Sequence, residues 1–268
     1  MVGASGTLSS VLVDTAARLG DFDERLTFLV GASGPGWHAV SQIEASGVTR
    51  WVDRIARDQA GDRHTAAAFL ARYLITPMVE APVAAYLLMR RVPQIDPAAV
   101  ALHRHPGGWF DRLAIDRCPV AVLPGDEAAS AADAAVVEDL DGLRSQLAHR
   151  LYNVLEPLLI TLRAGAPFGL HALWGTGADL IATVPVVLAT RMGMPPPIAQ
   201  AAWNDCDGVV DELAVHCGIL RARPRLEVEG HAAPVFVRGT CCLYYRCPAA
   251  VDGPDSTRYC TSCPLLPH

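Results

Sequence analysis

Residues 140–162, LDGLRSQLAHRLYNVLEPLLITL, decide the fold class of this chain. Leucines recur in this stretch at steps of three or four residues, so on a helix they form one apolar stripe. The stripe consists of Leu140, Leu143, Leu147, Leu151, Leu155, Leu158 and Leu162. Arg144 and Arg150 lie off it. The stretch therefore predicts a long amphipathic helix that packs on a helical core and kinks at Pro157.

The sequence on both sides of this helix predicts more helices and a few short strands. Apolar residues at helical spacing predict helices within 8–19, 37–56, 63–91, 170–190 and 195–218, with a bend in the third at Pro77 and Pro82. Short alternating or apolar runs predict strands at 100–104, 109–115 and 120–123, and a hairpin within 225–237. We therefore predict an α+β fold that is mostly helical, with small antiparallel β-sheets and a C-terminal cysteine-rich loop.

The predicted order of elements suggests two regions. Residues 1–124 would form an N-terminal helical region with a small sheet, and residues 125–268 a C-terminal helical region with the strand pair and the cysteine tail. A polar, alanine-rich linker at 125–133 would join them. Both regions together are also short enough to form one continuous domain.

Composition excludes several classes of protein. The chain has 268 residues, of which 51% are hydrophobic, and a net charge of -6. An acidic chain is poorly suited to neutralising phosphates, so we expect no nucleic-acid partner. The N-terminus shows no signal-peptide pattern, and no apolar stretch stands out as long enough to span a membrane. We therefore expect a cytoplasmic protein.

The cysteines point to the functional part of the chain. The sequence contains eight. In a reducing compartment such a number favours metal or redox chemistry over structural disulfides. We expect Cys118, Cys206 and Cys217 to be buried thiols without a role. The other five lie close to the C-terminus: Cys241, Cys242, Cys247, Cys260 and Cys263.

The spacing of the tail cysteines suggests which metal they hold. An adjacent pair, Cys241 and Cys242, is followed after seventeen residues by Cys260-Thr-Ser-Cys263. Four thiolates can hold a 2Fe-2S or 4Fe-4S cluster or one Zn²⁺. Neighbouring side chains diverge in an extended strand, which favours a cluster with more than one iron over a single zinc ion. Zinc remains an alternative, and Cys247 is an alternative ligand that could replace Cys242.

The same residues resemble a known family. Arg238-Gly-Thr-Cys241-Cys242-Leu-Tyr-Tyr-Arg246, followed by Cys260-x-x-Cys263-Pro-Leu, is similar to the C-terminus of the FhuF-like ferric siderophore reductases. The resemblance extends more weakly upstream through His171-Ala-Leu-Trp174-Gly175 and covers roughly the last half of the chain. The gap after the pair is longer here than is usual in the family. The resemblance implies a 2Fe-2S cluster with Cys241, Cys242, Cys260 and Cys263 as its ligands.

The resemblance also implies an activity and partners. The expected reaction is one-electron reduction of Fe(III) in a hydroxamate siderophore, which releases Fe(II) because the oxygen donors hold the reduced ion weakly. A ferredoxin or a flavin reductase would supply the electron, and peripheral contact with a membrane importer would fit iron transport. Arg238 and Arg246 flank the cysteine pair and could balance the charge of the cluster or dock an acidic donor. The alternatives are an iron-sulfur redox or iron sensor, and a siderophore-binding protein with a structural zinc tail.

Overall fold

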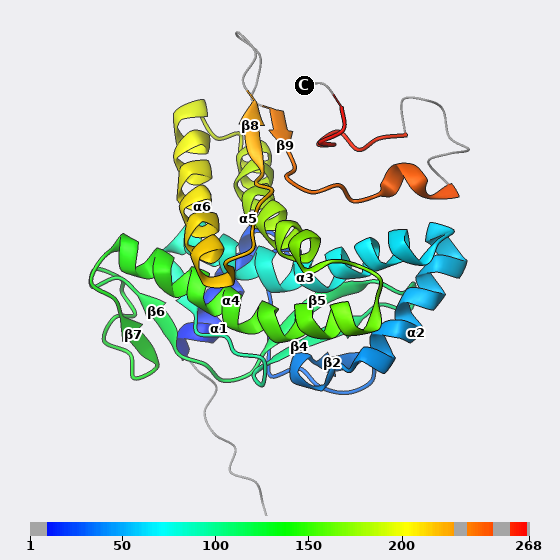
Figure 1. The fold of residues 1–268 in the computed structure, drawn as a ribbon. Coiled ribbons are helices and arrows are strands. Elements are labelled where there is room, and N and C mark those ends of the chain that lie inside the picture. Colours follow the sequence, from blue (N-terminus) through cyan, green and yellow to red (C-terminus); the bar gives the residue numbers. More distant parts are fainter. Residues whose placement is uncertain (1–9, 228–234, 249–257, 267–268) are drawn as a thin grey trace, which may run out of the picture.

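The computed structural model describes residues 10–227, 235–248 and 258–266. Six α-helices of the described part account for most of its regular structure (Figure 1). The helices are α1 (Ser10–Phe22), α2 (Ala45–Ile55), α3 (Arg63–Met89), α4 (Leu140–Gly165), α5 (Leu170–Met192) and α6 (Pro196–Cys217). Short 3-10 or π turns lie at η1 (Val40–Gln42), η2 (Ala56–Ala60) and η3 (Tyr244–Arg246). The predicted α+β class with mostly helical content is confirmed.

The strands of the described part form two small sheets and a hairpin. They are β1 (Leu29–Val30), β2 (Trp37–Ala39), β3 (Arg91–Pro93), β4 (Val100–Arg104), β5 (Phe110–Ile115), β6 (Val120–Val122), β7 (Ala134–Val136), β8 (Arg225–Glu227) and β9 (Val235–Val237). The first sheet has the order β1-β5-β4-β2 and the second β3-β6-β7. The central pairs are antiparallel as predicted, but β1 and β7 add parallel strands at the sheet edges.

The predicted helix at 37–56 is wrong in its first part. Trp37 to Ala39 form β2, whose residues pair antiparallel with β4 in the register Trp37 to His103. The helix itself begins only at Ala45. Apolar residues at helical spacing cannot distinguish a short buried strand from a helix, and pairing with a distant strand decided the outcome.

Helix α3 is the centre of the molecule. It is apolar nearly all round, and it contacts α2, α4 and α5 as well as β5. The helix is continuous through Pro77 and Pro82, and both prolines are buried. Asp62 caps its start by accepting hydrogen bonds from the backbone N–H groups of His64 (2.8 Å) and Thr65 (2.9 Å).

The leucine stripe lies on the buried face of α4 as predicted. Six of its seven leucines are buried, and Leu140 at the helix start is partly exposed. Core residues from both sides of the predicted boundary at 124 and 125 belong to one continuous cluster. Helices α3 and α4, which lie on opposite sides of that boundary, pack directly together.

Segment 125–133, predicted as a linker, forms turns that are tied to the core. The Asp126 carboxylate accepts two hydrogen bonds from Arg91, at 2.8 Å from Nε and 2.8 Å from Nη2. Nη1 of Arg91 also donates to Asp14 at 2.5 Å. Arg91 is only 2% exposed, so this bidentate contact fixes the segment against β3.

Helix α5 corrects the expectation that no segment is long and apolar enough to span a membrane. It is the one helix among the described residues that is long and apolar enough to cross a membrane by length and composition. However, 67% of its most apolar window is buried inside the protein. The helix packs against α3 and α6 and is the support of the C-terminal segment.

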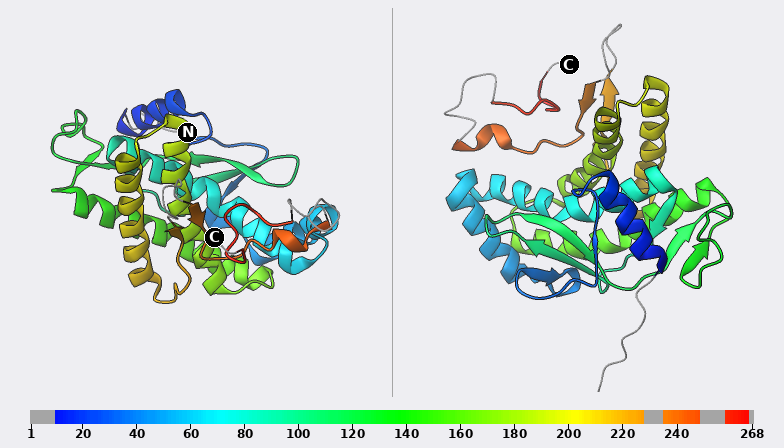
Figure 2. Two further views of the ribbon diagram at one scale, coloured as in Figure 1. Left: turned by 90° about the horizontal axis from the view of Figure 1, so that it is seen from above. Right: turned by 180° about the vertical axis from the view of Figure 1, so that it is seen from behind.

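The C-terminal segment lies across the helices after the predicted hairpin β8–β9 (Figures 1 and 2). After β9 the chain crosses α5 and α3, and then reaches η3 near the start of α3. Two parts of the earlier predictions, Val228 and Gly230 in the hairpin and most of the insertion at 248–259, lie outside the described residues. We call residues 238–248 the strap and residues 258–266 the knuckle segment.

Candidate metal centre

The adjacent cysteines lie in the strap directly after β9. Three residues, Arg238 to Thr240, connect the strand to the pair through a bend, and Leu243 after the pair adopts a left-handed conformation with φ of 61°. This turn directs the backbone N–H of Leu243 to the Cys241 sulfur at 3.5 Å. The backbone of Tyr244 also donates a hydrogen bond to the Cys242 sulfur. Backbone donors of this kind favour thiolate over thiol, which is the form that binds metal.

The knuckle segment brings the second pair of cysteines against the first. The Cys263 N–H donates to the Cys260 carbonyl oxygen at 3.1 Å, which closes a tight turn. The N–H of Arg238 donates to the Ser262 carbonyl oxygen at 3.1 Å and joins the knuckle segment to the strap. Sequence spacing predicted that these four cysteines meet, and the structure brings them together.

The four thiols form two pairs, and each pair joins the strap to the knuckle segment. The sulfurs of Cys242 and Cys260 are 3.8 Å apart. The Cys241 thiol makes a side-chain hydrogen bond with Cys263. Two thiolates bound to one tetrahedral metal with bonds of about 2.3 Å lie about 3.8 Å apart. The first pair therefore already has the separation of two ligands on one metal ion.

The pair Cys242 and Cys260 carries one negative charge. The hydrogen bond from Cys260 is the main reason that the pKa of Cys242 falls to about 5, and it outweighs the opposing effect of burial. The Tyr244 N–H and the positive charges of Arg238 and Arg72 act in the same direction. The same contact raises the pKa of Cys260. Since metal binding requires deprotonated thiols, Cys242 is already prepared as a ligand.

A small hollow with room for about one water molecule lies beneath the strap. Arg72 from α3, Asp179 from α5 and Arg238 from the strap line it together with Cys241 and Cys242. Burial and repulsion from Arg238 lower the pKa of Arg72, while Cys242 and Asp179 act in the opposite direction. The Arg72 guanidinium still remains charged at neutral pH because the ordinary arginine pKa is so high.

Asp179 was not predicted as a site residue. It is 1% exposed, and its two carboxylate oxygens accept hydrogen bonds from the N–H groups of Gly239 (2.6 Å) and Thr240 (3.0 Å). Burial raises its pKa to about 6 in spite of these hydrogen bonds. The signal that could have found it is simple: it is the only acidic residue in the apolar stretch 170–190.

The two arginines that flank the cysteine pair have different surroundings. Arg238 lies beside Cys242, and its Nε atom is buried without a hydrogen-bond partner in the described part of the chain. Its positive charge lowers the pKa of Cys242, and its role at a bound cluster stays a prediction. Arg246 instead pairs with Asp62 at 3.5 Å and ties η3 to the start of α3.

Cys247 does not share the contacts that join the other four thiols in the described part of the chain. It is 2% exposed, and its N–H donates to the Tyr244 carbonyl oxygen at 3.0 Å. Within the described residues it is not among the principal electrostatic neighbours of Cys241, Cys242 or Cys260. The geometry therefore favours the set Cys241, Cys242, Cys260 and Cys263 over one in which Cys247 replaces Cys242.

The scattered cysteines lie in the core as expected, with one exception. Cys118 and Cys206 are buried, and burial raises the pKa of both, that of Cys118 to about 12. Such thiols are poor nucleophiles and poor ligands at neutral pH. Cys217, at the end of α6, is partly exposed rather than buried.

A single zinc ion and a two-iron cluster place different demands on the four thiols. Among the residues that the structure describes, no three His, Cys, Asp or Glu side chains are arranged to hold a single metal ion. A tetrahedral zinc site needs all four sulfurs around one centre. A 2Fe-2S cluster needs two sulfurs on each of two irons, which matches two pairs that each bridge the strap and the knuckle segment.

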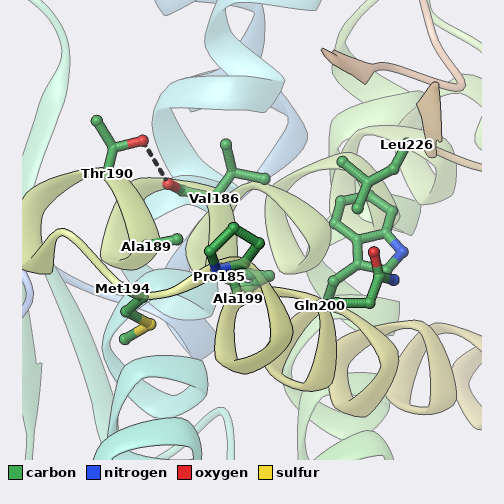
Figure 3. A pocket seen from close by; sticks show the side chains of 10 residues that line it. Pro185, Val186, Ala189, Thr190, Met194, Ala199, Gln200 and Leu226 are labelled. Atoms are coloured by element: carbon green, nitrogen blue, oxygen red, sulfur yellow. Dashed lines mark hydrogen bonds between the residues drawn. The ribbon is translucent and has the colours of Figure 1, made fainter. Parts of the chain in front are cut away.

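An apolar pocket lies farther along α5 (Figure 3). It has a volume of about 270 Å³ and lies between the C-terminal half of α5, the start of α6 and β8. Its walls are mainly apolar and include Pro185, Met194, Trp203 and Leu226, while Gln200 supplies a polar group. The mainly apolar lining with a few polar groups is typical of a small-molecule site, and the volume would suit a small ligand or part of a larger one.

The pocket is connected to the cysteines through the hairpin. Leu226 in the pocket wall pairs with Phe236 on β9, and the Trp203 ring packs edge to face against Phe236 at 5.8 Å. Two residues after Phe236 the chain reaches Arg238 and the strap. Asp179 and Pro185 are separated by six positions on α5, about 9 Å along the helix axis.

Comparison with known families and curated proteins finds no match to this chain. No model of a known protein family matches the chain, and no curated protein matches it. The resemblance to ferric siderophore reductases therefore remains a prediction that depends on the cysteine motif.

Proposed function

We propose that this protein is a cytoplasmic ferric siderophore reductase that holds a 2Fe-2S cluster with Cys241, Cys242, Cys260 and Cys263. The observation that carries the proposal is the arrangement of the four thiols in two pairs, each of which bridges the strap and the knuckle segment. The 3.8 Å separation of Cys242 and Cys260 suits two ligands of one iron. In the cytoplasm these thiol pairs would stay reduced and available for metal.

The substrate chemistry explains why this site needs no acid or base. A hydroxamate siderophore holds Fe(III) through hard oxygen donors, and one added electron gives Fe(II), which the same donors hold weakly. When bound, the cluster supplies a one-electron carrier. The residues of the chain have other tasks: the thiolates fix the position of the carrier, and Arg72 and Arg238 offset its negative charge.

We assign the organic part of the siderophore to the apolar pocket on α5 and α6. Aliphatic spacers of a hydroxamate chelate would cover Met194, Trp203 and Leu226, and Gln200 would hydrogen-bond to a polar group. The same helix, α5, supports both the pocket and the strap, so the chelated Fe(III) would approach the cysteines from this side. A ferredoxin or a flavin reductase would deliver the electron, and an importer at the membrane would deliver the substrate.

The first experiment measures iron, acid-labile sulfide and zinc per chain in anaerobically purified protein. Single Cys→Ser variants at positions 241, 242, 260 and 263 are compared with the parent. Cys247→Ser is the matched control, because this buried cysteine lies in the same strap. We expect two iron and two sulfide per parent chain, as in any 2Fe-2S protein, with loss in the four variants and retention in the control.

The second experiment tests the activity itself. With a chemical or enzymatic electron donor, the parent should convert several equivalents of ferric hydroxamate to Fe(II), trapped by a ferrous chelator. The Cys247→Ser variant should do the same. Iron and sulfide without turnover would instead indicate a redox or iron sensor. One zinc per chain without sulfide would contradict the proposal and indicate a structural tail on a siderophore-binding protein.

A further inference from the structure

The strap is held from beneath by one buried carboxylate. Asp179 Oδ1 accepts the N–H of Gly239 at 2.6 Å, and Oδ2 accepts the N–H of Thr240 at 3.0 Å. The Thr240 hydroxyl also donates to Oδ2. Within the described part of the chain, none of the ion pairs includes Asp179. All three of its hydrogen bonds are thus made to the two residues that precede the cysteine pair.

The same threonine is held on its other side by a glycine. Gly175 lies one turn before Asp179 on α5, and a Cβ at this position would be 2.1 Å from the Thr240 Cγ2 atom. Real Cβ atoms never approach another atom so closely, so only glycine leaves room for the Thr240 methyl group. Thr240 is therefore fixed by its polar atoms on Asp179 and by its methyl group on Gly175.

We propose that Asp179 and Gly175 are positioning residues that set the orientation of the Cys241–Cys242 pair through Thr240. The inference rests on the proposed metal centre, whose ligands they would orient, and it holds for a cluster or for zinc. Cys241 follows Thr240 directly, so a shift of this residue moves both sulfurs relative to the knuckle segment. A buried carboxylate needs hydrogen-bond donors to offset the cost of burial, and the donors of Asp179 all belong to the strap.

The sharpest test uses a steric change and its reversal. Gly175→Ala should displace Thr240 and remove most of the iron and sulfide. Thr240→Ser keeps the hydroxyl and removes the Cγ2 atom, after which the nearest atom to the new Cβ is the residue 240 Cβ at 3.5 Å, an ordinary contact. The double variant should therefore regain the metal content of Thr240→Ser alone, which should be close to that of the parent.

Gly177→Ala is the matched control on the same helix. A Cβ at Gly177 meets only the Leu155 Cδ1 atom, at 3.7 Å. We expect this variant to keep the metal content and the visible and electron paramagnetic resonance spectra of the parent.

Asp179→Asn tests the polar side of Thr240. The amide keeps one acceptor oxygen, but its NH₂ group faces N–H donors, so we expect a changed spectrum or loss of iron. In any cluster that does assemble, loss of the negative charge should raise the potential. Asp126→Asn is the control, since it removes another well-bonded aspartate and should lower the melting temperature without changing the spectrum.

A second measurement keeps this inference separate from the proposed function. Hydrogen exchange of the Gly239 and Thr240 amides should become at least tenfold faster in Gly175→Ala and return toward the parent rate in the double variant. If the parent contains no iron, the proposed function fails while this result still supports the positioning role. Unchanged exchange and metal content in Gly175→Ala, or no recovery in the double variant, would overturn the positioning role.

Discussion

Two aspartates, the half-buried Asp126 and the buried Asp179, have opposite surroundings in this molecule. Asp126 holds the guanidinium group of Arg91 in a bidentate ion pair, and this pairing keeps its pKa below the usual value. Asp179 accepts hydrogen bonds from the strap alone, and burial raises its pKa to about 6. The first ties a loop to the core, and the second supports the residues that precede two cysteines.

Burial and bonding partners together distinguish a carboxylate that stabilises the fold from one that serves a functional site. A paired carboxylate stabilises the fold because the cation offsets the cost of removing it from water. A buried carboxylate that has hydrogen-bond donors but no directly paired cation keeps a raised pKa because of desolvation, and groups with perturbed pKa values are common at functional sites.

The largest effect on stability is expected when the ion pair of Arg91 and Asp126 is broken. Arg91→Met leaves the half-buried Asp126 without its cation, and we expect a loss of about 3 to 5 kcal/mol in the free energy of unfolding. Chemical denaturation at pH 7 measures it. Arg91→Lys is the control and should lose less, because it keeps the charge but not the bidentate geometry. A loss below about 1 kcal/mol in Arg91→Met would show that the pair does not anchor the segment.

The pH dependence of stability should have opposite signs for the two aspartates. Asp126 has a lowered pKa in the folded protein. Its contribution to the free energy of unfolding is therefore present above the ordinary aspartate pKa of 3.8 and is lost as the pH falls through the folded pKa. Asp179 has a raised pKa of about 6, so between 3.8 and 6 the folded protein binds more protons than the unfolded one. The contribution of Asp179 to the free energy of unfolding therefore decreases as the pH rises, by on the order of 3 kcal/mol.

Denaturation of the parent, Asp126→Asn and Asp179→Asn from pH 3 to pH 7 checks these signs. Each variant should lack the slope of its own aspartate and keep the other. The same slope between pH 4 and pH 6 in the parent and in Asp179→Asn would contradict the assignment for Asp179.

A smaller effect is expected from the arginine that α3 contributes to the centre. Arg72→Gln removes a positive charge near Cys242, which disfavours the more negative reduced state of a cluster. We expect the potential to fall on the order of 50 mV, about a tenfold change for one electron. Redox titration measures it. Arg54→Gln, an exposed arginine on α2, should leave the potential unchanged, and an equal shift there would point to a general charge effect.

The smallest effect concerns the end of the strap. Arg246 and Asp62 form a partly exposed ion pair at 3.5 Å, and pairs of this kind contribute about 0 to 1 kcal/mol. Arg246→Ala should therefore hardly change the melting temperature or the metal content. A large loss of iron would instead give Arg246 the role at the centre that its position in the sequence suggested.

Local sequence patterns predicted much of the helical framework. The leucine spacing found α4, and similar patterns found α3, α5 and α6 near their observed bounds. The same approach missed β1, β3 and β7, which are only two or three residues long and exist through pairing with other strands. It also extended a helix into β2 for the same reason. Periodicity describes one segment, whereas pairing depends on two.

For the candidate metal centre, too, the sequence predicts one part and the tertiary structure decides the other. The sequence by itself determined that Cys241, Cys242, Cys260 and Cys263 belong together, because thiols at these short spacings are meaningful without knowledge of the fold. Only the tertiary structure brought Arg72 and Asp179 beneath them, from helices about 60 to 170 residues earlier in the chain. Their roles come from burial and from contact with the strap, and these properties arise only when α3 and α5 pack together.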